Sequence, residues 1–138
     1  TPALPLAEEE NRIRQGLSQW SNVPVDQLES KLPIAKDIPL MAQVAEEHGL
    51  PYWLFPLFSI MESSAGQHTK DKNNPFNWGI RTGYKPKNLE EVMRKMAYSF
   101  TDRPDVGLDY SKRYQEPLKQ GDFQQTVSIN SQQRQRKQ

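Results

Sequence analysis

The chain has 138 residues, a formal net charge of +1 and a hydrophobic fraction of 35%. This length suits one domain with a single core, and the mean hydropathy of −0.87 indicates that part of the chain is polar tail or loop. The small net charge argues against nucleic acid as the main partner, and no apolar run reaches the ~18 residues of a membrane span. With no cysteine in the sequence, disulfides and thiolate metal sites are excluded.

The first 36 residues are expected to form an N-terminal helix and a connection. Residues 1–5 carry two prolines and are expected to be loose. Ile13, Leu17 and Trp20 follow at helical spacing, which predicts an amphipathic helix over about 6–20. Prolines and a mixed pattern over 21–36 predict a connection with room for one short turn of helix.

Residues 37–129 are expected to form the main domain, which should be mainly α. Asp37 is a good N-cap for a helix over about 38–48, and Gly49 supplies a stop. Residues 51–61 are apolar on all sides, which predicts a central buried helix. Within it, Pro56 should either bend the helix or mark its true start.

The second half of this domain begins with turn-forming residues. Glycine, proline and asparagine over 66–87 predict a loop or a short β-hairpin lobe. Asn88 caps a further amphipathic helix over about 89–100, with Glu91 at near-capping-box spacing. Two shorter helices are expected over 108–120 and 122–129. The polar segment 130–138 has nothing apolar to bury and should be disordered.

Glu62 is the residue that points most clearly to chemistry. It is an acid at the end of the most hydrophobic segment, close to Phe58, Ile60 and Met61. Apolar surroundings favour the neutral form of a carboxyl group, which can then deliver a proton to a leaving oxygen, as glycoside cleavage requires. The alternative is a helix-terminal glutamate that faces water or pairs with a lysine of the following loop.

Three short segments give the sequence a family likeness. Glu62-Ser63 is followed, after a polar loop, by Asn73-Asn74-Pro75-Phe76 and then by Arg81-Thr82-Gly83-Tyr84. In this order the chain resembles the lysozyme-like superfamily, above all bacterial endo-β-N-acetylglucosaminidases of glycoside hydrolase family 73, and more distantly lytic transglycosylases. The likeness covers about 40–128. It implies that Glu62 is the catalytic acid and that the substrate is peptidoglycan or a related N-acetylglucosamine polymer.

The sequence also departs from the family pattern. Asn77-Trp78 stands between Phe76 and Gly79, where the family usually has glycine directly after phenylalanine. The loop after Ser63 is short, so the lobe that often carries a second carboxylate is reduced. Asp71 is the best-placed second carboxylate, although a solvated loop aspartate is the alternative interpretation. A substrate-assisted or a lytic route would need Glu62 alone.

Sugar recognition requires flat apolar faces together with amide donors, and the segment after Glu62 supplies both. The expected sugar-binding residues are Ser63, Asn74, Phe76, Asn77, Trp78 and Tyr98. The resemblance implies that Tyr84 or Tyr98 assists near the reacting sugar. The alternative is that Phe76 and Trp78 fill the core beneath the loop and that Tyr98 is a helix residue of the core.

Other kinds of site are poorly supported. His48 and His68 lack metal-ligand spacing, and no phosphate-binding loop occurs, so neither metal nor cofactor is expected. The resulting hypothesis is a cell-wall glycosidase that works outside the cytoplasm, with an envelope, a phage or a secretion apparatus as candidate partner. One rival is a catalytically silent lysozyme-like module that binds glycan or serves assembly. A second rival is an unrelated helical interaction domain.

Overall fold

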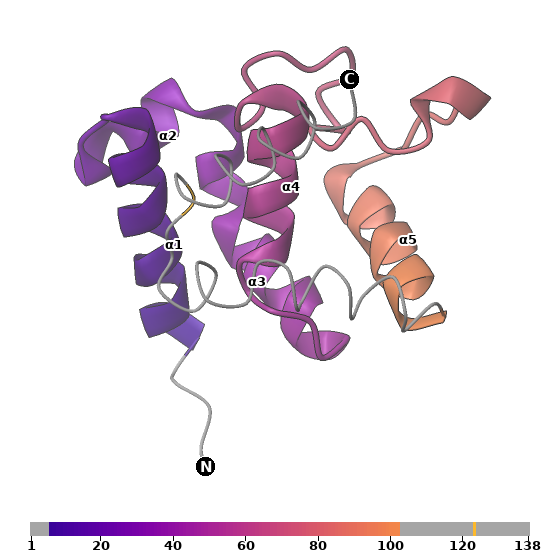
Figure 1. Ribbon diagram of the computed structural model, residues 1–138, viewed down its shortest axis with the longest axis horizontal. Coiled ribbons are helices and arrows are strands. Elements are labelled where there is room, and N and C mark those ends of the chain that lie inside the picture. The colour runs from indigo at the N-terminus through magenta and orange to yellow at the C-terminus, as the bar shows by residue number, and fades with distance from the viewer. Residues whose placement is uncertain (1–5, 103–122, 124–138) are drawn as a thin grey trace, which may run out of the picture.

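The computed structural model describes residues 6–102 together with Phe123. This part of the chain is mainly helical, with five α-helices, three short 3-10 turns and no strand among the described residues (Figure 1). The expected fold class, mainly α, is confirmed at this level. The helices expected over 108–120 and 122–129 and the tail 130–138 lie outside the described residues, apart from Phe123, which is helical and buried.

Helix α1 (Leu6–Ser21) confirms the amphipathic helix expected over 6–20. Ile13 and Leu17 are fully buried, because their spacing of four residues places both on one face. Glu8 and Glu9 lie in the first turn, where the helix dipole favours negative charge.

The segment expected as a connection is more helical than its sequence indicates. It contains the 3-10 turn η1 (Val25–Gln27), the short helix α2 (Leu28–Lys31) and the 3-10 turn η2 (Pro33–Asp37). Prolines break any long helix here, but their fixed φ suits the start of a short turn. Leu28, Leu32, Ile34 and Ala35 of this segment are buried in the same core cluster as side chains of α3, α4 and α5, whereas Val25 is 46% exposed.

Helices α3 (Ile38–Glu47) and α4 (Leu54–Ser63) form the centre of the molecule. Helix α3 contacts α1, α4 and α5, and Figure 1 shows α1 and α5 on opposite sides of this pair. Pro56 lies in the first turn of α4, where its missing N–H has no partner to lose. Pro56 therefore marks the start of the helix.

Helix α5 (Leu89–Asp102) starts as predicted, with the Asn88 side-chain oxygen accepting a hydrogen bond from Glu91 N at 2.9 Å. The Glu91 carboxylate differs from a regular capping box, because it accepts from Lys87 N at 2.8 Å. Among the described residues, no helix has the length and apolar character needed to cross a bilayer.

The chain between α4 and α5 is a loop that passes over one end of the helices (Figure 1). It begins with three consecutive residues of positive φ, namely Ser64 at 52°, Ala65 at 62° and Gly66 at 87°. Its one regular element in the described chain is the 3-10 turn η3 (Ile80–Thr82). Of the two expected forms, loop or hairpin, this segment takes the loop.

Candidate active site

Glu62 occupies the last turn of α4, next to Ser63 at the end of the helix. Burial along α4 is continuous from Leu54 to Ile60 and stops at Met61, and Glu62 is exposed. The expected enclosure of Glu62 by apolar walls is therefore wrong for the free protein. The apolar side chains of α4 pack into the core, whereas the loop covers this end of the helix only on one side.

Ser63 points into the protein and joins the helix end to the loop. Its side chain is 3% exposed, and its hydroxyl lies 2.5 Å from the carbonyl oxygen of Pro75 and 3.1 Å from that of Ser59. The same oxygen accepts a hydrogen bond from Gly66 N at 3.0 Å. Ser63 thus holds the loop against α4, and its role in the structure is to position that loop.

Two asparagines of the loop act in a similar way. Asn74 is buried, accepts from Trp78 N at 3.0 Å and donates to Trp78 O at 2.9 Å. Asn77 has a φ of 50° and donates from its side chain to the backbone oxygen of Glu62 at 2.9 Å. Its amide oxygen is buried and has no hydrogen-bond partner among the described residues. The loop is therefore fastened directly to the backbone of the proposed acid.

A hollow of about 300 Å³ opens beside Glu62. It is lined by Glu62, Asn77, Gly79, Ile80 and Arg81. Glu62 and Arg81 are both exposed, and neither forms an ion pair within the described part of the chain. The hollow thus combines a carboxylate, a guanidinium and the apolar side chain of Ile80, which is 42% exposed.

Sequence reasoning missed Ile80 and Arg81 as lining residues. Both lie in η3, which is flanked by Gly79 at φ 68° and Gly83 at φ 79°. Tyr84 N donates to Gly79 O at 3.2 Å and thereby closes the turn. Gly79 and Gly83 are the sequence feature that could have indicated this turn, because glycine readily adopts the left-handed conformation that a tight turn requires. The side chains between them, Ile80 and Arg81, are exposed.

Asp71, the expected second carboxylate, does not line this hollow. Its side-chain oxygen accepts a hydrogen bond from Asn73 N at 2.9 Å, which is the geometry of an Asx turn. Asp71 is therefore used to shape the loop. In the described residues, Glu62 is the one carboxylate at the hollow.

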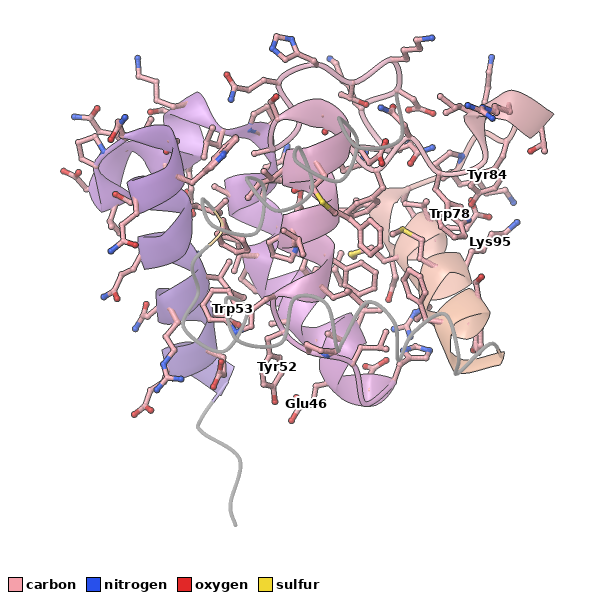
Figure 2. All side chains as sticks on the ribbon, in the orientation of Figure 1. Glu46, Tyr52, Trp53, Trp78, Tyr84 and Lys95 are labelled. Atoms are coloured by element: carbon pink, nitrogen blue, oxygen red, sulfur yellow. The ribbon has the colours of Figure 1, made fainter. Side chains whose placement is uncertain are left out.

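Tyr84 lies next to the hollow but is held away from it by other partners. Its hydroxyl donates to the Glu91 carboxylate at 3.1 Å, and the Lys95 ammonium lies 4.3 Å from the centre of its ring (Figure 2). Burial, followed by the hydrogen bond and the charge of Glu91, raises the pKa of Tyr84 to about 12. This phenol therefore stays protonated near neutral pH.

The remaining expected aromatic residues differ in position. Phe76 is 3% exposed and packs against Phe55 at 5.9 Å between ring centroids, so it belongs to the core. Trp78 is half-buried, with its ring edge-on to Phe100 at 6.1 Å. Tyr98 is 58% exposed on α5, and its ring meets that of His48 at the end of α3. None of the three lines the hollow.

Comparison with known proteins adds no relative: no family model, no curated protein and no solved structure matches the chain. Within the described ranges, no group of three or more histidine, aspartate or glutamate side chains is arranged to hold a metal ion. The candidate site therefore rests on the geometry around Glu62.

Proposed function

We propose that the chain cleaves the glycan strands of peptidoglycan, or of a related N-acetylglucosamine polymer, with Glu62 as the general acid. The observation that carries this proposal is a carboxylate at the end of a buried helix that forms no ion pair with any described residue and lies beside a hollow lined by an amide and a guanidinium. The order of Glu62-Ser63 and Asn73-Asn74-Pro75-Phe76 supports a lysozyme-like assignment of this helical domain. Work outside the cytoplasm, in association with an envelope, a phage or a secretion apparatus, belongs to the same proposal.

The exposure of Glu62 gives the bound sugar a part in the mechanism. In the free protein the Glu62 carboxylate is exposed to water. A sugar seated on Ile80 and Asn77 covers the carboxyl group and displaces that water. Loss of water favours the protonated form, which can then donate its proton to the glycosidic oxygen.

The absence of a second carboxylate from the described lining favours routes that use one acid. In a substrate-assisted route the N-acetyl oxygen of the sugar attacks its own anomeric carbon as the leaving oxygen takes the proton of Glu62. In a lytic route Glu62 protonates the leaving oxygen, a hydroxyl of the same sugar attacks the anomeric carbon and gives up its proton to the Glu62 carboxylate, and the product is an anhydro sugar. Both differ from the usual pair of carboxylates, in which a second group stands about 5–10 Å from the acid.

A second function, a catalytically silent glycan-binding or assembly module, is favoured by the same exposure of Glu62. A binding surface needs the hollow and its polar rim but no enclosed acid. Product release distinguishes the two functions, because a binding module binds peptidoglycan without releasing soluble products.

The experiment is digestion of purified peptidoglycan by the wild type, Glu62→Gln and Glu8→Gln, with soluble products identified by mass spectrometry. Glu8 is an exposed residue of the first turn of α1, so its substitution controls for the loss of one surface charge. We expect muropeptides from the wild type and Glu8→Gln, and at least a hundredfold less from Glu62→Gln, as for loss of a general acid. The reducing end and any anhydro sugar then identify the bond and the route.

Activity that survives in Glu62→Gln overturns the assignment of the acid. If no protein releases product, co-sedimentation with insoluble peptidoglycan decides between the remaining hypotheses. Retention of all three proteins supports the binding module, and retention of none supports an unrelated helical domain.

A further inference from the structure

A second hollow, of about 660 Å³, lies between η2 and the loop, on residues that the proposed reaction does not use. Four residues of η2 line one wall, five residues of the loop line the other, and Leu89 at the start of α5 completes the lining: Pro33, Ile34, Lys36 and Asp37 from η2, and Gly66, Thr69, Lys72, Asn73 and Pro75 from the loop. Its volume falls in the range of about 300–1,000 Å³ that is typical of small-molecule sites. The hollow is therefore large enough for a ligand of two or three amino-acid residues.

The apolar part of this hollow is well packed. Ile34 is 2% exposed and Pro75 is buried, and Leu89 packs against the same core. Two polar residues of the lining are already engaged, because the Thr69 hydroxyl donates to Asn74 O at 3.0 Å and Asn73 donates to Lys87 O at 3.3 Å. These contacts fix the wall and leave the charged side chains to meet a ligand.

Asp37 is the acidic residue of this lining. It is half-buried at the N-cap of α3, yet its carboxylate makes no capping hydrogen bond and pairs with no cation among the described residues. Burial raises the pKa of this carboxyl group, and Lys36 lowers it by a smaller amount. A desolvated carboxylate without a partner is costly to the fold, and such groups in clefts are often kept for binding.

Lysines supply the opposite charge at the rim. Lys36 and Lys72 both line the hollow, are exposed and form no ion pair within the described chain. They come from the two opposite walls. A ligand between the walls thus meets one carboxylate and two ammonium groups around an apolar floor.

We propose that this hollow binds a small zwitterion of the amino-acid or short-peptide class. The ligand ammonium would lie on Asp37, its carboxylate between Lys36 and Lys72, and its aliphatic part on the floor of Ile34, Pro75 and Leu89. A zwitterion can place each of its charges against a group of opposite sign, whereas a purely anionic or purely cationic ligand leaves one kind of lining charge without a partner. The inference stands apart from glycan cleavage and does not depend on it.

The hollow also has a direct connection to Glu62. Ser63 bonds both Gly66 N and Pro75 O, and these two residues line the second hollow. A ligand that tightens this wall therefore tightens the loop that carries Asn77 and η3. Occupation of the second hollow is expected to slow amide exchange across the loop.

The experiment is a titration of the full chain with dialanine, followed by amide chemical shifts. Two capped probes, N-acetyl-dialanine and dialanine amide, each remove one charge from the ligand. We expect dialanine to bind in the millimolar range and to shift the amides of the lining residues. Each capped probe should bind about tenfold more weakly, which corresponds to loss of one charge-assisted hydrogen bond.

The matched variants are Asp37→Asn and Asp26→Asn. Asp26 is an exposed aspartate of η1 that does not line the hollow. Asp37→Asn should weaken dialanine about tenfold and leave N-acetyl-dialanine unchanged, whereas Asp26→Asn should alter neither. The capped probes test the proposal on the wild type even if Asp37→Asn fails to fold.

Each of the following results would overturn the proposal. The first is equal binding of dialanine and both capped probes. The second is dialanine binding that Asp37→Asn leaves intact, or shifts that map to the hollow at Glu62. The third is the absence of saturable shifts for any probe.

Discussion

The helical bundle is held together by apolar burial, whereas the loop after Ser63 combines the core packing of Phe76 with a set of directional hydrogen bonds. In the bundle, Leu17, Met41 and Leu57 are fully buried among other apolar side chains. In the loop, the fastening contacts are hydrogen bonds from Ser63, Asn74 and Asn77 to backbone groups. Apolar burial is non-directional and scales with area, whereas a hydrogen bond requires its two partners in place.

Because of this difference, substitutions in the two regions are expected to affect the site in different ways. Loss of one apolar group from the bundle lowers the stability of the whole domain, because the core is continuous. Loss of one polar group from the loop leaves a buried partner unsatisfied and favours local opening. The hollow at Glu62 thus depends on a few polar side chains that contribute little to the cohesion of the helices.

The largest effect is expected from Leu57→Ala in the centre of α4. It removes a fully buried side chain and should lower the free energy of unfolding by about 2–5 kcal/mol. Denaturant unfolding followed by circular dichroism measures the loss. A change below about 1 kcal/mol would show that the helices are not held by this core.

Asn74→Ala is expected to act locally. It removes both bonds to the backbone of Trp78 and should cost about 1–3 kcal/mol. Hydrogen exchange should accelerate across the loop and stay nearly unchanged in α3 and α4. The control is Asn73→Ala, which removes an exposed asparagine with one bond to Lys87 O. Equal acceleration of hydrogen exchange in the helices and in the loop would contradict a local role for Asn74.

The Tyr84 phenol should lose its proton at a higher pH than an ordinary tyrosine. Its pKa in the folded protein is raised to about 12, so the stabilisation that it provides is complete below pH ~10 and is lost as the pH rises toward 12. The difference in phenolate absorbance between wild type and Tyr84→Phe isolates this group. Glu91→Gln should move the transition to lower pH, because it removes the neighbouring negative charge. A transition near pH ~10 in the wild type would contradict the burial of the phenol together with its contact with Glu91.

The smallest expected effect belongs to Asp37→Asn. Burial raises the pKa of Asp37 in the folded state, so its charge opposes folding above that pKa and has no effect below the unfolded value of 3.8. The variant should therefore be more stable near neutral pH, by less than ~0.5 kcal/mol because solvent screens the group, and equal to wild type in acid. Thermal unfolding at several pH values tests the sign. A loss of stability at neutral pH would mean that the charge stabilises α3.

The helices could be predicted because their signal is local. The spacing of Ile13 and Leu17, the cap at Asn88 and the apolar run before Glu62 lie within a few residues of the elements they define. The burial of apolar residues over 21–36 was not predicted, because two prolines interrupt the helical spacing of the apolar residues in this segment. Helix α2 and the 3-10 turns gain their stability from the core and not from their own sequence.

The candidate site was predicted in part. Glu62 and Asn77 come together at the hollow, but Asp71, Phe76, Trp78 and Tyr98 do not line it. The bond from Ser63 to Pro75 joins residues 12 positions apart, and only the folded loop determines such contacts. Exposure of Glu62 likewise depends on where the loop crosses α4, which no pattern within the helix specifies.

Three consecutive residues of left-handed backbone, Ser64, Ala65 and Gly66, follow α4. A right-handed helix cannot be extended through such a segment without reversing each of these dihedral angles, and two of the residues carry a Cβ that resists the left-handed region. Helix α4 therefore ends at Ser63 and does not continue into the loop. With the helix end at this position, Glu62 faces solvent and Ser63 faces the loop.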